Sequence, residues 1–133
     1  MLNPSDLTLA RATVQEIHLE LIRRSQHNNF DGEDVLADLL AHREDWQAVL
    51  FDTHGLSGHS GMSGPIKLRD MAENLYNVDT LYILAVSQNS AERLAALAEP
   101  WMADTVRIYD QEETDDLLGG ADENLCVVEM WWD

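Results

Sequence analysis

The chain has 133 residues, of which 25 are Asp or Glu and 8 are Lys or Arg, so its formal net charge is −17 at pH 7. This length predicts one domain over 1–133, and the negative charge disfavours direct binding to nucleic acid or membranes while it favours basic protein partners. The single cysteine, Cys126, cannot form an internal disulfide, and no segment approaches the roughly 20 apolar residues of a membrane span, so we expect a cytoplasmic protein.

The first 44 residues predict a helical hairpin. A helix over about 5–25 is indicated by apolar residues at three- and four-residue spacing, namely Leu7, Ala10, Val14, Ile17 and Leu21. A second helix over about 32–43 has Asp31 as a candidate N-cap and an apolar stripe of Val35, Leu36, Leu39 and Leu40. We expect this hairpin (1–44) to pack on a core formed by 45–133.

A strand is predicted at 46–52, followed by a Gly- and Ser-rich loop over 53–65. Helical spacing returns between Leu68 and Tyr76, and an almost uninterrupted apolar run predicts a buried strand at 79–86. A capping box at 89–92 then begins another helix.

Three elements complete the chain. Alternation predicts a strand at 105–109, an acidic helix follows at about 111–118, and a last apolar strand lies at 124–131. The order favours an α/β fold with about four mostly parallel strands, of which the two apolar strands, 79–86 and 124–131, are central. An antiparallel last strand would convert this architecture into an α+β sandwich.

Parallel strands predict a ligand crevice beyond their carboxyl ends. The residues expected there are Asp52, His54, Ser87 and Asp110 as ligand-binding side chains, with Asp52, His54 and His59 as candidate ligands of a divalent metal. The many glycines of the loop oppose this, because ordering such a loop costs conformational entropy.

The same loop could cradle a phosphate, with Lys67 and Arg69 as the nearby cations. However, neither a Walker pattern nor a Gly-x-Ser-x-Gly nucleophile pattern is present. The acidic run at 110–123 also fits no register of an EF-hand loop. We therefore assign no catalytic residue and no cofactor.

The acidic charge is concentrated at the C-terminal end. Residues 99–133 carry 11 acidic residues and one basic residue, Arg107, which gives this segment a net charge of −10 and leaves −7 for the first 98 residues. Two adjacent tryptophans on a strand point to opposite faces, so one of them can be exposed as an anchor for a partner. The candidate partner-binding residues are Glu112, Glu113, Asp115, Asp116, Trp131 and Trp132.

The leading hypothesis is a non-enzymatic, acidic interaction or regulatory protein that docks on a basic partner, as an inhibitor, an immunity protein or a phosphate-backbone mimic does. A small metal- or phosphate-binding enzyme that uses the crevice and the loop over 53–65 is the alternative. A third hypothesis is a homo-oligomer that pairs through the first helix. The acidity is also consistent with a salt-adapted host, and composition alone does not separate recognition from adaptation.

Overall fold

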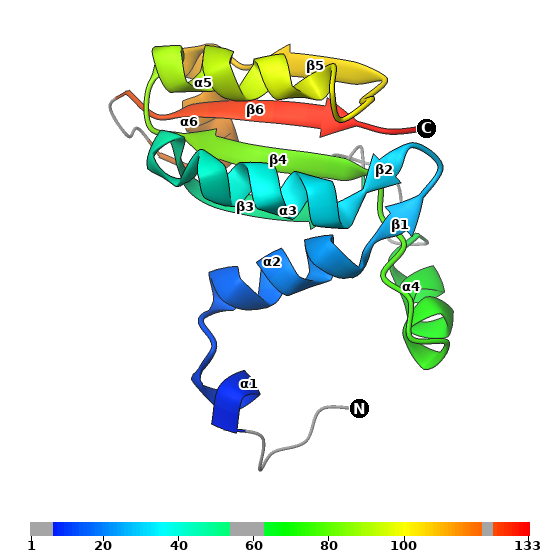
Figure 1. The fold of residues 1–133 in the computed structure, drawn as a ribbon. Coiled ribbons are helices and arrows are strands. Elements are labelled where there is room, and N and C mark those ends of the chain that lie inside the picture. The colour runs from blue at the N-terminus through cyan, green and yellow to red at the C-terminus, as the bar shows by residue number, and fades with distance from the viewer. Residues whose placement is uncertain (1–6, 54–62, 121–123) are drawn as a thin grey trace.

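The computed structural model describes residues 7–53, 63–120 and 124–133, which form an α+β fold (Figure 1). In chain order the elements are α1 (Leu7–Arg11), α2 (Val14–Arg24), β1 (Gln26–His27), β2 (Phe30–Asp31), α3 (Gly32–Ala41), η1 (Arg43–Asp45), β3 (Trp46–Asp52), α4 (Ser63–Ala72), β4 (Thr80–Ala85), α5 (Gln88–Ala95), η2 (Ala96–Ala98), β5 (Thr105–Ile108), α6 (Gln111–Leu118) and β6 (Cys126–Trp131).

The main sheet has four strands in the order β3-β4-β6-β5, and every neighbouring pair is antiparallel. Strands lie where the sequence predicts them and the two apolar strands are central, but the predicted mostly parallel α/β architecture is wrong. A continuous apolar run shows that a strand is buried and does not encode its direction. The last strand inserts between β4 and β5, which run in the same direction without pairing, and it is antiparallel to both.

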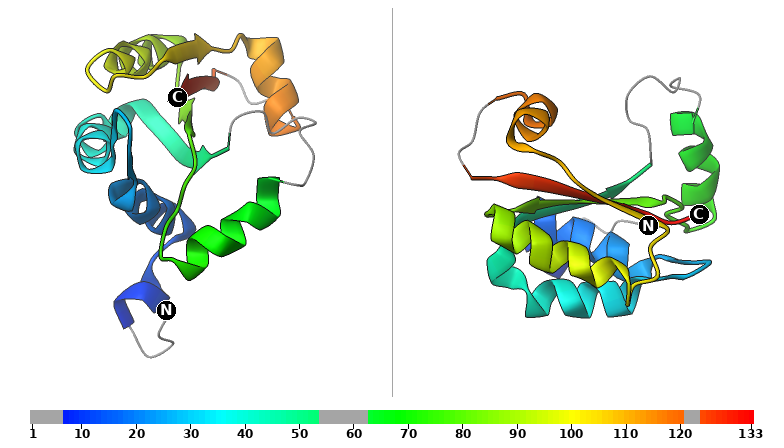
Figure 2. Two further views of the ribbon diagram at one scale, coloured as in Figure 1. Left: turned by 90° about the vertical axis from the view of Figure 1, so that its right-hand side faces the viewer. Right: turned by 90° about the horizontal axis from the view of Figure 1, so that it is seen from above.

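Helices are distributed unequally over the two faces of the sheet (Figure 2). Helices α2, α3 and α5 lie on one side, which we call the inner face. Helix α6 lies over the other side, the outer face, near one end of the strands, and α4 stands beyond the opposite end. The hydrophobic core therefore lies between the inner face and its three helices.

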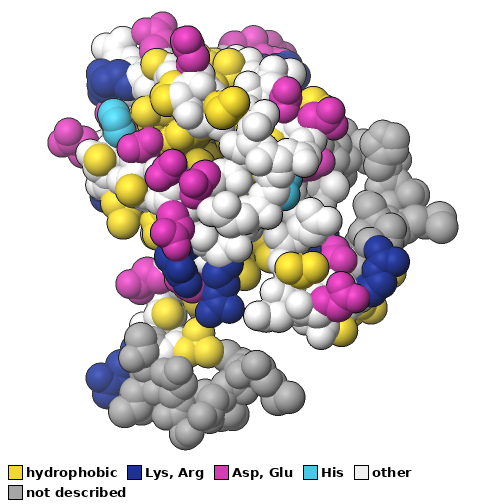
Figure 3. Space-filling model, turned by 45° about the vertical axis from the view of Figure 1, so that its right-hand side comes forward, with side chains coloured by type: hydrophobic (Ala, Val, Ile, Leu, Met, Phe, Trp, Pro, Cys, Tyr) yellow, Lys and Arg dark blue, Asp and Glu magenta, His cyan; other side chains and the backbone are white. Residues whose placement is uncertain are grey.

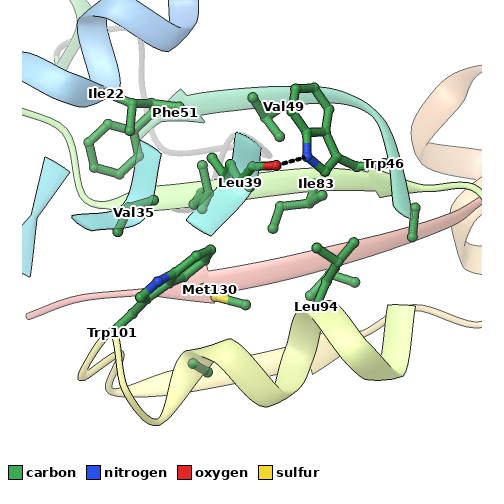
Figure 4. Packing of buried hydrophobic residues seen from close by; sticks show 14 of the residues in the cluster. Ile22, Val35, Leu39, Trp46, Val49, Phe51, Ile83, Leu94, Trp101 and Met130 are labelled. Atoms are coloured by element: carbon green, nitrogen blue, oxygen red, sulfur yellow. Dashed lines mark hydrogen bonds between the residues drawn. The ribbon is translucent and has the colours of Figure 1, made fainter. Parts of the chain in front are cut away.

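Aromatic residues from distant parts of the chain fill this core. Phe30 stacks on Phe51 with ring centroids 4.5 Å apart, and Trp132 meets Phe30 edge to face at 4.8 Å. The indole of Trp46 donates a hydrogen bond to the carbonyl oxygen of Leu39 at 2.7 Å (Figure 4). A buried tryptophan is stabilised when its N–H finds such an acceptor.

The N-terminal hairpin differs from its prediction in two ways. The predicted helix over 5–25 is divided, because Thr13 and Glu16 form a capping box that starts α2. The predicted apolar stripe also points away from the core: Val14 is 76% exposed and Ile17 is 39% exposed, whereas Ile22 is buried.

The turn between α2 and α3 brings two backbones close together. The short strands β1 and β2 pair antiparallel, with Asn28 in the left-handed region at a φ of 47°. A Cβ atom on Gly32 would lie 1.9 Å from the carbonyl oxygen of Ile22. Only glycine fits at this position, and the amide of Gly32 donates to the carbonyl oxygen of Ser25 at 3.0 Å.

Candidate functional site

The outer face of the sheet carries a row of mixed side chains aligned across all four strands. Leu50 pairs with Tyr82, Tyr82 with Glu129, and Glu129 with Arg107. Side chains alternate between the two faces along a strand, and the strand neighbours of these residues face the core. These residues therefore point away from the core. A polar and aromatic surface therefore lies opposite the apolar inner face.

Three of the outer side chains form a network with α6. The Tyr109 hydroxyl donates to Glu129 Oε1 at 2.9 Å, and the Arg107 guanidinium carbon lies 4.1 Å from the centre of the Tyr109 ring. Arg107 Nη2 also donates to Glu113 Oε2. The single basic residue of 99–133 is therefore already paired with an acidic residue of the same surface.

Two tyrosines of this surface are held in their neutral form. Burial, followed by the negative charge of Glu129, raises the pKa of Tyr82 to about 12. Burial also raises the pKa of Tyr109, with a further contribution from its hydrogen bond to Glu129. Both phenols are protonated at neutral pH and can act as hydrogen-bond donors.

Helix α6 is fixed over the outer face at both its start and its middle. Asp110 and Glu113 form a capping box at its N-terminus, and the buried hydroxyl oxygen of Thr114 accepts a hydrogen bond from the amide of Val127 at 3.2 Å. This attachment turns Glu112 and Asp116 toward the exterior. Acidic residues in the first turn also stabilise the helix through its dipole.

The two adjacent tryptophans have opposite environments. Trp132 is 1% exposed, and its indole N–H donates to the carbonyl oxygen of Trp101 at 2.9 Å. Trp131 is half-buried at the end of β6, in register with Thr80 and Thr105 on the outer face. The prediction that both tryptophans contribute to a partner surface is corrected accordingly, because Trp132 lies in the core and only Trp131 reaches the outer face.

The predicted strand-end crevice does not form, because it required parallel strands. Strands β3 and β4 are antiparallel, and Asp52 at the end of β3 pairs with Thr80 at the start of β4. Ser87 and Asp110 follow β4 and β5, which run in the same direction, so they lie at the other end of the strands from Asp52. Each of these residues has a local role. Asp52 accepts a hydrogen bond from Lys67 Nζ at 2.7 Å, whereas Ser87 and Asp110 are the N-caps of α5 and α6.

The predicted metal ligands His54 and His59, and most of the loop that carries them, lie outside the described residues. Within the described ranges, no group of three or more His, Cys, Asp or Glu side chains is arranged to hold a metal ion. Cys126 is buried, its Sγ lies 3.1 Å from the carbonyl oxygen of Tyr109, and burial raises the pKa of its thiol.

Sequence reasoning missed Tyr82, Tyr109 and Glu129 as surface residues. A weak signal was present, since Glu129 interrupts an apolar run at the spacing of a strand. Its partners could not be identified, because they come from two other strands and their proximity depends on strand order. The structure thus unites residues that the sequence separates by up to 47 positions.

A second polar cluster lies on the inner side and joins η1 to α5. Asp45 is 5% exposed, and its Oδ1 accepts hydrogen bonds from Ser90 Oγ at 2.8 Å and from Arg93 Nη2 at 2.7 Å. His42 Nδ1 lies 3.3 Å from the other oxygen. These bonds, chiefly those from Arg93, hold the pKa of Asp45 well below its usual range. Both carboxylate oxygens of Asp45 have partners within the cluster, so we assign the cluster a role in stability.

Comparison with known proteins gives no relative. No family model, no curated protein and no solved structure matches the chain. Of the helices within the described ranges, none has both the length and the apolar character that a membrane crossing requires. Any functional assignment therefore rests on the geometry of the outer face and on the charge of the chain.

Proposed function

We propose that this protein is a small acidic interaction or regulatory domain that docks on a basic surface of a partner protein, in the manner of an inhibitor, an immunity protein or a mimic. Its docking surface comprises the exposed acidic side chains of α6 and the outer-face residues Tyr82, Glu129 and Trp131. The supporting observation is that acidic and aromatic side chains share one surface whose Arg107 is already neutralised by Glu113.

Charge and composition both suit such a role. Carboxylates that lack a cationic partner attract a basic protein over distances of about a Debye length and accelerate its encounter. Half-buried tryptophan and tyrosine side chains provide contact area at a small entropic cost, and they often contribute most of the binding energy of interfaces. Trp131 and Tyr82 are therefore the expected anchors, and the α6 carboxylates lie toward the opposite end of the strands from Trp131.

The test compares two triple variants that lose the same charge. Immobilised wild-type protein is exposed to lysate of its host and eluted with a salt gradient, and the eluted proteins are identified. Glu112→Gln/Asp115→Asn/Asp116→Asn should lower the affinity for a basic partner at least tenfold, because it removes carboxylates at the contact. The control, Glu73→Gln/Glu92→Gln/Glu99→Gln, changes exposed residues elsewhere and should alter the affinity less than threefold.

A second pair of variants tests the aromatic anchor. Trp131→Thr should also weaken binding at least tenfold, whereas Val106→Thr on the exposed edge strand β5 should not. Equal loss in the two triple variants would show that net charge alone attracts the partner, and it would refute the proposed surface. Elution that is independent of salt would refute the electrostatic basis of docking.

A further inference from the structure

A histidine in the turn between α2 and α3 belongs to the aromatic part of the core. The ring of His27, on β1, stacks on Phe30 with the ring centroids 5.5 Å apart and an angle of 17° between the ring planes, and its centroid lies 6.4 Å from that of Phe51. Both phenylalanines in turn meet Trp132 edge to face. A titratable side chain therefore completes the stack that joins the turn to the sheet.

One nitrogen of this ring is enclosed without a hydrogen bond. Nε2 of His27 is buried and has no hydrogen-bond partner within the described part of the chain. In the neutral ring this nitrogen can be the one without a proton, so only an acceptor is left unused. The imidazolium carries a proton on both nitrogens, so an N–H group at Nε2 would be buried without an acceptor. The site therefore suits the neutral ring and disfavours the charged ring.

Charged and titratable groups lie on the elements around His27, and most of them are acidic. In the described part of the chain they are Arg24 at the end of α2, Asp31 on β2, Asp52 on β3 with its partner Lys67, Tyr76 and Asp79 between α4 and β4, and Asp133 after β6. The negative charge of Asp79 raises the pKa of His27, but burial lowers this pKa by more. The folded protein therefore prefers the neutral ring in spite of its acidic surroundings.

Two hollows beside His27 give the ring a way out of the stack. One of about 700 Å³ lies between the C-terminal end of α2 and α4 (Figure 3), and one of about 280 Å³ lies beside the end of β6. The side chain of His27 lines both hollows. Rotation of a protonated ring into water would satisfy both of its N–H groups, but it would break the stack on Phe30 and Phe51.

The turn that carries His27 is closed by two further contacts. The amide of Gly32 donates to the carbonyl oxygen of Ser25 at 3.0 Å, and Asn28 Nδ2 donates to the backbone carbonyl oxygen of Asp133. The first bond closes the turn at its base, and the second joins its tip to the end of β6. Loss of the His27 stack would therefore loosen the turn and its contact with Asp133.

We propose that His27 is a pH-sensitive latch, which holds the β1–β2 turn on the sheet while its ring is neutral and releases the turn when the ring is protonated. An open turn binds a proton at the ordinary pKa of histidine, about 6.5, whereas the closed turn binds it only at lower pH. The stability of the closed turn is therefore complete above pH 6.5 and is lost as the pH falls below that value. His27, Phe30 and Phe51 belong to the inner side, so the latch does not depend on the proposed docking function.

The first experiment titrates the imidazole signals of the wild-type protein by NMR between about pH 8 and pH 4.5. The midpoint for His27 should lie below 6.5, because the closed turn disfavours the charged ring. Its ring protons should lose the upfield shift that stacking on Phe30 and Phe51 produces, in step with protonation. A midpoint at or above 6.5 would overturn the proposal, because the closed turn would then accept the charged ring.

The second experiment measures hydrogen exchange of the Gly32 amide, which is exposed when the turn opens. Its protection, corrected for the intrinsic exchange rate, should fall at least threefold between pH 7 and pH 5. The upper limit is about thirtyfold, for a ring with an ordinary pKa of about 6.5 that is protonated only in the open turn. Amides of α6, a helix that lies over the other face of the sheet, should change less than twofold.

Two variants identify the histidine that is responsible. His27→Phe keeps a ring in the stack and replaces the unpartnered nitrogen with carbon, so Gly32 should be protected at least as well as in wild type at pH 7, and this protection should change less than twofold at pH 5. His42→Gln removes a histidine at the other end of α3, beside Asp45, and should retain the wild-type fall. A wild-type fall in His27→Phe would overturn the latch. If His27→Phe does not fold, the titration of the wild-type protein decides.

Discussion

The two faces of the sheet differ in what covers them and in how their side chains are satisfied. The inner face is covered by three helices, and its residues Phe51, Leu81 and Ile83 are completely buried. The outer face has α6 at one end, and Leu50 remains 36% exposed there. The same strands therefore carry a core on one side and an accessible polar and aromatic surface on the other.

This difference separates stability from recognition. Free energy of unfolding comes mainly from apolar burial, which is concentrated on the inner face. Side chains on the outer face contribute less to stability, so they are available for selection on binding. Four comparisons between the faces test this separation, and they are given from the largest expected effect to the smallest.

The largest contrast is between neighbouring residues of β3 that point to opposite faces. Phe51→Ala should lower the free energy of unfolding by about 3–5 kcal/mol, because it leaves a cavity beside Phe30 and Trp132. Leu50→Ala should cost less than about 1 kcal/mol. Urea unfolding measures both, and equal losses would contradict the division between the faces.

The inner polar cluster should contribute next. Asp45→Asn weakens the bonds from Arg93 and Ser90, which should cost about 2–3 kcal/mol at pH 7. Because the pKa of Asp45 is lowered in the folded state, its stabilisation is present above the ordinary pKa of aspartate, about 3.9, and is lost as the pH falls below that value.

Acid titration of stability checks this sign. Between pH 6 and pH 3 the wild type should lose more stability than Asp45→Asn does, so the two curves should converge as the pH falls. Parallel curves would show that the aspartate does not provide the pH dependence. Asp34→Asn, an exposed change on α3, is the control and should leave the wild-type curve unchanged.

The attachment of α6 to the outer face should have a smaller effect. Thr114→Val leaves the amide of Val127 without its acceptor, at a cost of about 1–2 kcal/mol. Hydrogen exchange of the α6 amides should accelerate with it, since the helix loses its central attachment. Thr105→Val, at an exposed site on β5, should change neither quantity, and an equal effect there would argue against this role for Thr114.

The smallest effect at neutral pH concerns Tyr82. Its raised pKa means that the folded state keeps a proton that the unfolded state releases, so stability is full below pH 10 and falls as the pH rises toward 12. Tyr82→Phe should leave stability at pH 7 within about 0.5 kcal/mol of wild type and reduce this alkaline loss. Absorbance titration should show that Glu129→Gln lowers the pKa of Tyr82; an unchanged value would contradict the proposed coupling.

Local signals predicted the elements better than their arrangement. The strand at 46–52 was predicted at the positions that β3 occupies, and the acidic helix at 111–118 coincides with α6. Both have strong local causes, an apolar run in one and an N-terminal cap in the other. The division at Thr13 was missed because helical spacing continues across it, although Glu16 supplied the capping signal.

The candidate site was predicted only in part. The acidic residues of α6 and the presence of one tryptophan outside the core follow from composition and from strand alternation, which place Trp131 and Trp132 on opposite faces. Alternation does not say which face is covered, so Trp132 could not be assigned to the core. Tyr82, Tyr109 and Glu129 were not identified, because their contacts join strands that are distant in the sequence.

The sequence by itself determined where the strands and the last helix lie, that the charge is concentrated in the C-terminal third, and that the apolar strands are central. Periodicity, capping and composition act over a few residues, so these properties are local. The tertiary structure alone decided the antiparallel pairing, the separation of Asp52 from Ser87 and Asp110, and the burial of Trp132 in the core. Those features depend on which long-range pairings bury the most apolar surface, and no short segment contains that information.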